Sequence, residues 1–112
     1  MHLELRKIES VSILELSGRF DAYEVGPVVE WINQNMEAFT TRLVINLSGV
    51  KFVDSTALAT LVQGMKRCRQ QQGDLHLCCL QQPVRIIFEL TRLDRAIDIF
   101  ATEREAVETF GD

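Results

Sequence analysis

The sequence has few of the residues that cross-link small proteins or bind metals. It contains three cysteines in 112 residues. Cys78 and Cys79 are adjacent and Cys68 stands ten residues before Cys78, so they provide neither a disulfide framework nor the spaced cysteine pairs of a zinc site. We therefore expect the thiols to pack as small apolar side chains. No metal site and no cofactor are predicted.

Long apolar runs are also missing. No stretch approaches the roughly 20 apolar residues that a helix needs to cross a bilayer. Residues 1–5 alternate between apolar and polar or acidic side chains, unlike the basic and then apolar layout of a signal peptide. We therefore expect a cytoplasmic protein that does not insert into a membrane.

Positive charge is in deficit. Twelve Lys and Arg residues face sixteen Asp and Glu residues, which gives a formal net charge of -4. Nucleic-acid binding normally needs clustered basic side chains to displace counterions. The most basic stretch, residues 66–69, falls late in a predicted helix, where cations complement the negative end of the helix dipole. We predict no nucleic-acid partner.

Catalytic groups are sparse as well. His2 lies at the start of the chain and His76 lies inside an apolar run, so neither is placed as a base beside a nucleophile. The glycines are scattered, and none forms a phosphate-binding loop of the dinucleotide or Walker type. We therefore predict no catalytic residue and no enzyme. No motif in the sequence supports an enzyme or a small-ligand carrier.

What the chain does have is apolar periodicity. The apolar share of 46% is ample for the core of one domain spanning residues 1–112. Alternating runs at 2–8 and 11–16, separated by two residues, predict an antiparallel hairpin, and residues 18–21 break this pattern. Apolar runs at 42–47, followed by a turn at 48–49, and at 75–80 predict buried strands, and 97–100 predicts a last short one.

Helical spacing separates these strands. Apolar positions recur with a helical period from Val25 to Phe39 and from Leu58 to Cys68, Pro83 starts a short helix, and Thr102 begins a capping-box signature. A hairpin followed by alternating strands and helices predicts an α/β domain. Its mixed sheet has four to five strands, antiparallel at the start and parallel afterwards, with helices packed on it and residues 42–47 in the centre.

Trp31 is left open by the pattern. It adjoins the apolar stripe of the first helix without belonging to it. Its indole ring is either an anchor on the buried face or an exposed contact, because the amphipathic ring suits both environments.

The most informative segment joins the central strand to the second helix. In open α/β sheets, ligands bind beyond the carboxyl ends of the strands. Asp54, Ser55 and Thr56 stand at that junction. One interpretation is that Asp54 or Ser55 only caps the helix, which is worth about 1 kcal/mol.

A second interpretation depends on the number of oxygen-bearing side chains. Three in succession exceed what one cap needs, so at least one hydroxyl should remain exposed at the positive end of the helix dipole. A phosphate there would be stabilised by the dipole and by free N–H groups. It would also add about two negative charges beside Asp54, which would repel a partner.

Two motifs resemble those of a known family. Residues 54–58, Asp54-Ser55-Thr56-Ala57-Leu58, resemble the Asp-Ser-[Ser/Thr]-Gly-Leu phosphorylation motif of the STAS domain, and residues 18–21 resemble its Gly-x-[Leu/Phe]-Asp signature. Bacterial anti-sigma factor antagonists and the cytoplasmic ends of sulfate transporters share this domain. A similar element order runs from Leu3 to Phe110. Without a transmembrane span, the free-standing antagonist is favoured over a transporter tail.

The resemblance implies a partner switch. In that scheme the unphosphorylated antagonist binds an anti-sigma factor that is also a serine/threonine kinase. Phosphorylation ends the complex, and a metal-dependent serine/threonine phosphatase restores it. The family's phosphorylated hydroxyl falls on Thr56, with Ser55 as the fallback. The residues implied at the partner interface are Asp21, Asp54, Ser55, Thr56, Ala57 and Leu58.

Ala57 departs from the family motif, which usually has glycine at this position. The added methyl group removes backbone freedom where a kinase would need close access. A second hypothesis is therefore a non-phosphorylated adaptor of the same fold, serving as a subunit of a larger cytoplasmic or membrane-associated complex.

Overall fold

The computed structural model describes residues 1–111. Five strands form one sheet in the order β1-β2-β3-β4-β5, with β1 antiparallel to β2 and every later pair parallel. The strands are β1 His2–Ile8, β2 Val11–Phe20, β3 Arg42–Val53, β4 Asp74–Cys78 and β5 Ile99–Phe100. The helices are α1 Gly26–Glu37, α2 Ser55–Gln70, α3 Gln82–Leu90 and α4 Glu103–Glu108, with a 3₁₀ turn at Leu93–Arg95. The predicted mixed α/β sheet with β3 at its centre is confirmed.

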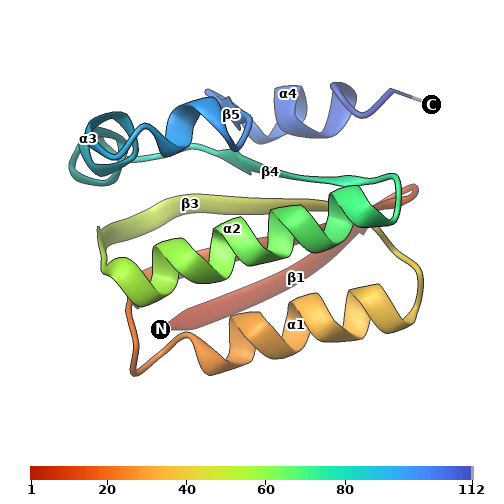
Figure 1. The fold of residues 1–112 in the computed structure, drawn as a ribbon, viewed down its shortest axis with the longest axis horizontal. Coiled ribbons are helices and arrows are strands. Elements are labelled where there is room, and N and C mark those ends of the chain that lie inside the picture. The colour runs from red at the N-terminus through yellow and green to blue at the C-terminus, as the bar shows by residue number, and fades with distance from the viewer. Residues whose placement is uncertain (112) are drawn as a thin grey trace.

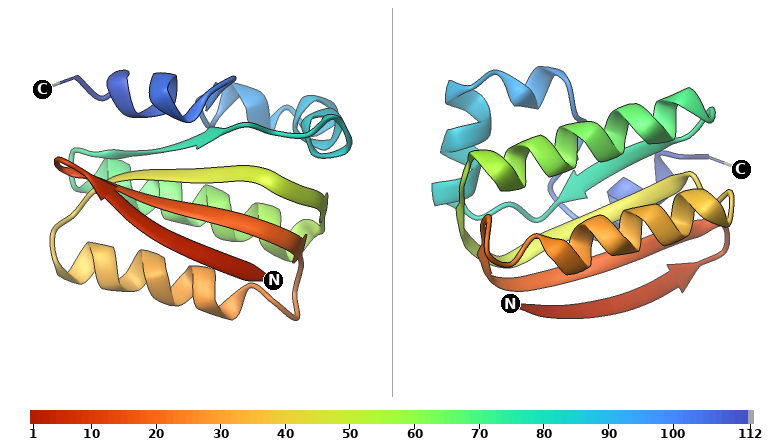
Figure 2. Two further views of the ribbon diagram at one scale, coloured as in Figure 1. Left: turned by 180° about the vertical axis from the view of Figure 1, so that it is seen from behind. Right: turned by 60° about the horizontal axis from the view of Figure 1, so that its bottom comes forward.

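The opening hairpin forms as predicted. Its register runs from the His2–Ser17 pair to the Ile8–Val11 pair, and Glu9 takes a positive φ of 53° in the two-residue connection. Most of β1 is exposed, whereas β2 is largely buried. β1 is the edge strand, whereas β2 lies between β1 and β3 and packs Val11 and Ile13 against Ala106 of α4. Seen from behind in Figure 2, β1 and β2 lie in front, and α1 and α2 pack on the opposite side of the sheet.

Two strands are longer than the sequence predicted. The expected break at residues 18–21 is wrong, because β2 continues to Phe20, and the expected turn at 48–49 is wrong, because β3 continues to Val53. Shifts in the β2–β3 register absorb these irregular residues. Gly49 is required there, since a Cβ at this position would overlap the side chain of Ser17 on the neighbouring strand.

The main core lies between the sheet and α1 and α2. Figure 1 shows these two helices side by side along one face of the sheet. Trp31 is only 5% exposed and belongs to this core, so it is a buried anchor. Phe39 was expected on the buried face of α1, but it lies beyond the end of the helix at Glu37 and is exposed.

The cysteines behave as small apolar side chains at two of three positions. Cys68 and Cys78 are buried, and Cys79 is half-buried. Burial raises the pKa of the Cys68 thiol to about 12. It also raises the pKa of Cys78, because both thiolates would lose their hydration. These two thiols therefore stay protonated and unreactive at neutral pH.

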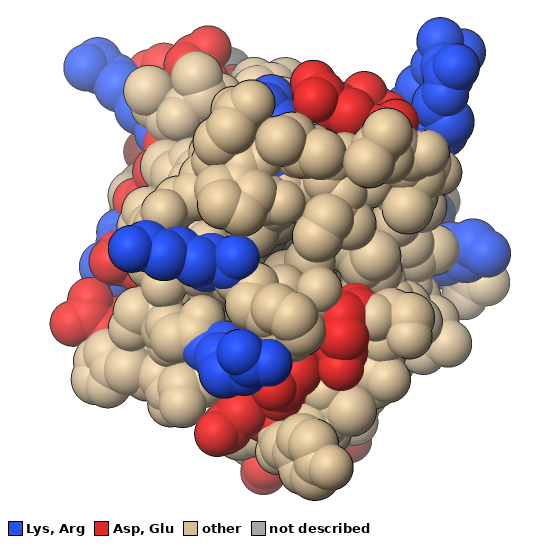
Figure 3. Space-filling model, turned by 90° about the vertical axis from the view of Figure 1, so that its left-hand side faces the viewer, with Lys and Arg blue, Asp and Glu red and all other residues tan. Residues whose placement is uncertain are grey.

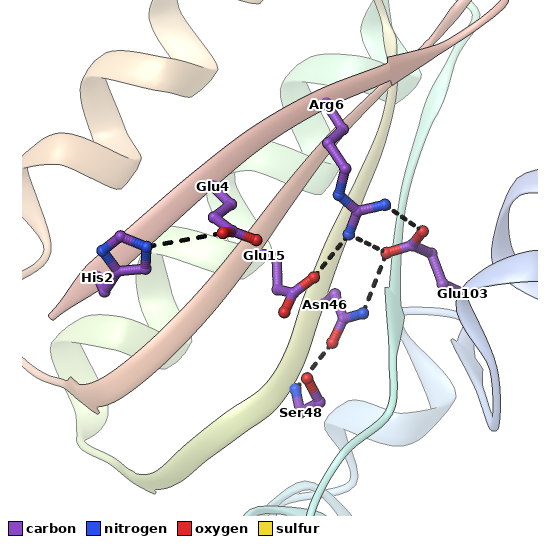
Figure 4. Close-up of polar contacts among 7 residues, drawn as sticks. All are labelled: His2, Glu4, Arg6, Glu15, Asn46, Ser48 and Glu103. Atoms are coloured by element: carbon purple, nitrogen blue, oxygen red, sulfur yellow. Dashed lines mark hydrogen bonds and ion pairs between the residues drawn. The ribbon is translucent and has the colours of Figure 1, made fainter.

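The other face of the sheet is held by α4 and a polar network. The Arg6 guanidinium donates to Glu103 at 2.6 and 2.7 Å and to Glu15 at 2.7 Å, and the Asn46 amide donates to Glu103 at 3.0 Å. Figure 4 shows that these side chains come from three neighbouring strands and converge on the carboxylate at the start of α4. The network therefore fastens α4 across β1, β2 and β3.

This network predicts a pH-dependent contribution to stability. The hydrogen bonds from Arg6 hold the pKa of Glu103 below its ordinary value of 4.5. A carboxyl with a depressed pKa in the folded state stabilises the fold above its unfolded pKa, and this contribution is lost as the pH falls through the folded pKa. We expect Glu103→Gln to lower the free energy of unfolding by about 1–2 kcal/mol at pH 7. The difference from the parent should shrink steadily below pH 4.5.

Urea denaturation at pH 7 and at pH 3 measures this difference. Glu108→Gln is the matched control, because its carboxylate is exposed and faces only Arg104 within α4. That variant should stay within about 0.5 kcal/mol of the parent at both pH values. A Glu103→Gln deficit that is equally large at pH 3 would contradict the electrostatic explanation.

Candidate functional site

Three junctions meet at the carboxyl edge of the parallel strands. The loop between β2 and α1, the start of α2 after β3, and the segment between β4 and α3 all lie there. Figure 3 views this end of the molecule and shows acidic and basic side chains around a broad uncharged area. The Gln81 amide donates to the Ser48 carbonyl, which ties the β4–α3 segment to β3. Residues 54–58 therefore lie on a surface that all three junctions form together, which we call the composite edge.

Asp54 both caps α2 and fastens a neighbouring loop. One carboxylate oxygen accepts from the Ala57 N–H at 2.9 Å, and the other accepts from the Ala22 N–H at 2.9 Å. These backbone hydrogen bonds hold the pKa of Asp54 below its ordinary value. The carboxylate is consequently ionised at neutral pH and fixed in orientation. The capping interpretation is correct for Asp54.

The two hydroxyl side chains that follow take no part in capping the helix. Ser55 and Thr56 are the first two residues of α2, and both are exposed. Neither hydroxyl makes a hydrogen bond to any part of residues 1–111, while the Thr56 carbonyl accepts from the Thr60 hydroxyl at 3.0 Å. Both hydroxyls therefore stand in solvent at the positive end of a 16-residue helix.

Ala57 and Leu58, the next two residues of α2, are less exposed than the two hydroxyl residues before them. Ala57 is completely buried, and Leu58 is half-buried against the main core. Ala57 therefore cannot touch a partner in this conformation, and its expected place at the interface is corrected to a packing role. Because its methyl group faces the core, it adds no bulk to the outer surface beside Thr56.

Asp21 is largely buried at the start of the β2–α1 loop, with 8% of its surface exposed. Its carboxylate accepts from the Tyr23 and Glu24 N–H groups, both at 3.1 Å, and lies 3.3 Å from Arg19 Nε. Its place at the partner interface stays a prediction, and its carboxylate oxygens are used within this region of the fold. Asp21 shapes the turn that Asp54 then fastens through Ala22.

Three exposed side chains at this edge were missed at the level of sequence. The Arg19 guanidinium stacks over the Phe52 ring at 3.9 Å from its centre, and Tyr23 is 96% exposed in the adjoining loop. Arg19 and Phe52 are cross-strand partners of β2 and β3. Only this register brings them together, and the expected end of β2 at residue 16 concealed it. They add a cationic and aromatic surface at the carboxyl ends of β2 and β3.

The chain belongs to the STAS domain family, whose model matches residues 2–106. Among its relatives is the anti-sigma-B factor antagonist of Listeria monocytogenes, which is 33% identical over 90 residues, covering 80% of this chain and 79% of the relative. The anti-sigma F factor antagonist of Paenibacillus polymyxa is 22% identical over 96% of this chain and 92% of its own length. The resemblance drawn from residues 18–21 and 54–58 is confirmed.

Solved structures agree on the fold. An anti-sigma factor antagonist from Mycobacterium paratuberculosis superposes with a TM-score of 0.88 at 22% identity, over 99% of this chain and 94% of that one. The antagonist SpoIIAA in its unphosphorylated form gives 0.83 at 21% identity, over 96% and 95% of the two chains. Its phosphorylated form, from Bacillus, gives 0.76 at 20% identity, over 96% and 98%.

The described residues contain no helix whose length and apolar character would let it span a bilayer. The helix of greatest length, α2, has 16 residues and carries Lys66, Arg67 and Arg69 near its end.

Proposed function

We propose that this chain is a cytoplasmic anti-sigma factor antagonist that is not itself an enzyme. It binds an anti-sigma factor that is also a serine/threonine kinase, through the edge formed by Asp54, Ser55, Thr56, Leu58 and the β2–α1 loop. Phosphorylation of Thr56 ends this complex, and a metal-dependent phosphatase restores it. The relatives named as anti-sigma factor antagonists support the class of partner.

The observation that carries the proposal is the exposed Thr56 hydroxyl at the start of α2. Asp54 already supplies the cap, so the hydroxyl can be modified without removing a hydrogen bond that the fold needs. In the transfer, Thr56 Oγ1 attacks the γ-phosphorus of ATP, the hydroxyl proton is released, and ADP leaves. SpoIIAA, which shares the fold, has been solved in both unphosphorylated and phosphorylated forms.

The surface around Thr56 suits a protein partner. Tyr23 and the Arg19–Phe52 stack are large amphipathic groups of the kind that anchors interfaces. Asp54 lies beside them with a fixed negative charge. A phosphate on Thr56 would bring about two further negative charges to this edge, so a partner with acidic groups there would be repelled.

Phosphate mapping tests the proposal. The protein is incubated with ATP and with anti-sigma kinases encoded beside STAS proteins, and the modified residue is located by mass spectrometry. We expect a single phosphate on Thr56 that is absent from Thr56→Val and still present in Ser55→Ala. Label on Ser55 would move the switch to the fallback hydroxyl. Stable binding to such a kinase without any label would favour the adaptor hypothesis.

A further inference from the structure

A second cluster of functional side chains lies away from the Thr56 edge, on the face of the sheet that α4 covers. Asp74 and His76 are two residues apart on β4, so they point to the same side. Asp98 comes just before β5, where its carbonyl accepts from the Leu77 N–H. One ligand-type atom from each of the three side chains lies within 4.8 Å of the others.

The His76 ring is locked in place. It is 3% exposed, and its Nδ1 lies 2.8 Å from the Ala106 carbonyl oxygen of α4. A carbonyl can only accept, so Nδ1 carries the proton. Phe110 stacks on the ring with centroids 3.9 Å apart, and Phe100 packs against it at 4.9 Å. The other nitrogen, Nε2, is thereby aimed at the two carboxylates.

The Nε2 atom of His76 faces two carboxylate oxygens, one of Asp74 at 3.6 Å and one of Asp98 at 3.9 Å. Both distances exceed those of a hydrogen bond, so neither carboxylate is bonded directly to the ring. A metal ion between them would bind all three atoms at once.

The spacing fits a small transition-metal ion. Bonds of about 2.0–2.2 Å at a tetrahedral angle separate two ligand atoms by about 3.4 Å. The ligand atoms here lie 3.6 and 3.9 Å from His76 Nε2 and within 4.8 Å of one another, and the Asp98 carboxylate can move closer by a change of rotamer, since its side chain is 59% exposed. A neutral imidazole with two carboxylates is a ligand set suited to Zn²⁺ and unlike the all-oxygen sets of Mg²⁺ or Ca²⁺.

The surrounding groups orient the ligands. Arg69 Nε and the Leu75 N–H both bond to Asp74 Oδ1, at 2.9 and 2.8 Å, which leaves Oδ2 directed at His76. The His76 bond to the Ala106 carbonyl fixes the tautomer that presents a lone pair at Nε2. Such outer hydrogen bonds are the usual support of a metal-binding histidine.

The geometry points to a Zn²⁺-type metal site formed by Asp74 Oδ2, His76 Nε2 and an Asp98 carboxylate oxygen, with solvent completing the coordination. This site is independent of the Thr56 switch. It links β4 to the residue preceding β5, and through the Ala106 carbonyl it links both to α4. Metal binding would consequently stabilise the carboxy-terminal part of the fold.

Calorimetric titration with zinc chloride in a buffer that does not chelate metals tests the site. We expect one Zn²⁺ ion per chain. Asp98→Asn should weaken binding at least tenfold, because it replaces one ligand while leaving the backbone bond to Leu77 intact. Nitrogen-detected NMR of the histidine rings should show a large shift of His76 Nε2 and a much smaller one of its protonated Nδ1.

Two control variants address the other potential zinc ligands. His2 lies 3.9 Å from Glu4 on the exposed hairpin, and Cys79 is half-buried near His76 in sequence. His2→Gln and Cys79→Ser should both bind Zn²⁺ as the parent does. The site would be rejected by the absence of binding up to millimolar zinc, by undiminished affinity in Asp98→Asn, or by loss of binding in either control variant.

Discussion

Thr56→Glu is expected to weaken binding to the partner kinase by about 100-fold or more, while leaving the fold intact. The substitution places a permanent negative charge near Asp54, whose carboxylate is held ionised by the Ala57 and Ala22 N–H groups. Like charges brought together in an interface cost several kcal/mol, and 100-fold corresponds to about 2.7 kcal/mol. Isothermal titration with the purified partner measures the loss.

The same change should have little effect on stability, which separates repulsion from unfolding. Thr56 is exposed in the first turn of α2, where a negative side chain is favoured by the helix dipole by about 0.3–1 kcal/mol. Repulsion from Asp54 offsets part of that gain. The thermal midpoint should therefore stay within a few degrees of the parent.

Thr56→Val is the matched control for the charge. It keeps the shape of the side chain but removes the hydroxyl, so it should bind like the parent and accept no phosphate. Equal affinity of Thr56→Glu and Thr56→Val would show that charge at this position does not gate binding. The adaptor hypothesis would then replace the switch.

The order of the elements and the start of α2 could be predicted because their signals are local. Alternation in residues 2–8 and 11–16 and the helical period beyond Leu58 depend only on neighbours along the chain. The cap at Asp54 follows from the same kind of signal. Counting oxygen atoms against the need of one cap predicted at least one exposed hydroxyl, and both Ser55 and Thr56 are exposed.

The features that the sequence did not reveal depend on contacts between strands. The extension of β3 through Gly49 requires the close approach of Ser17 on β2, and the Arg19–Phe52 stack requires that register as well. The hydrogen bonds of Asp21 to its own loop are likewise invisible in composition. Asp98 joins Asp74 and His76 only through the pairing of β5 with β4.

Asp54 explains how one short segment can serve both stability and regulation. Its two carboxylate oxygens join the start of α2 to the β2–α1 loop, so the composite edge is held by a residue that is not itself modified. The hydroxyls of Ser55 and Thr56 that follow make no hydrogen bond within the described residues, so the fold does not depend on them. This division of roles allows charge to be added at Thr56 without loosening the surface on which a partner would dock.

Gly73→Ala should destabilise the fold by about 3 kcal/mol, although it adds a single methyl group to a half-buried residue just before β4. A Cβ at Gly73 would overlap the Thr41 carbonyl oxygen, which accepts from the Asp74 N–H at 3.0 Å. Relieving the overlap separates the starts of β3 and β4 and weakens the first pair of their parallel register. For a chain of this size the thermal midpoint should fall by about 10–20 °C. Thermal unfolding followed by circular dichroism measures this change.

Gly26→Ala is the matched control for that loss. Apart from its neighbours in the chain, nothing lies within 4 Å of a Cβ at Gly26, which begins α1. Alanine restricts the unfolded chain and favours the helix, whereas its Cβ is crowded by the ring of Pro27 that follows, so the effect should stay within about 1 kcal/mol of the parent. The overlap at Thr41, and not the loss of a glycine as such, therefore accounts for the difference between the two variants. Equal midpoints for Gly73→Ala and Gly26→Ala would refute that explanation and with it the close packing of β3 against the start of β4.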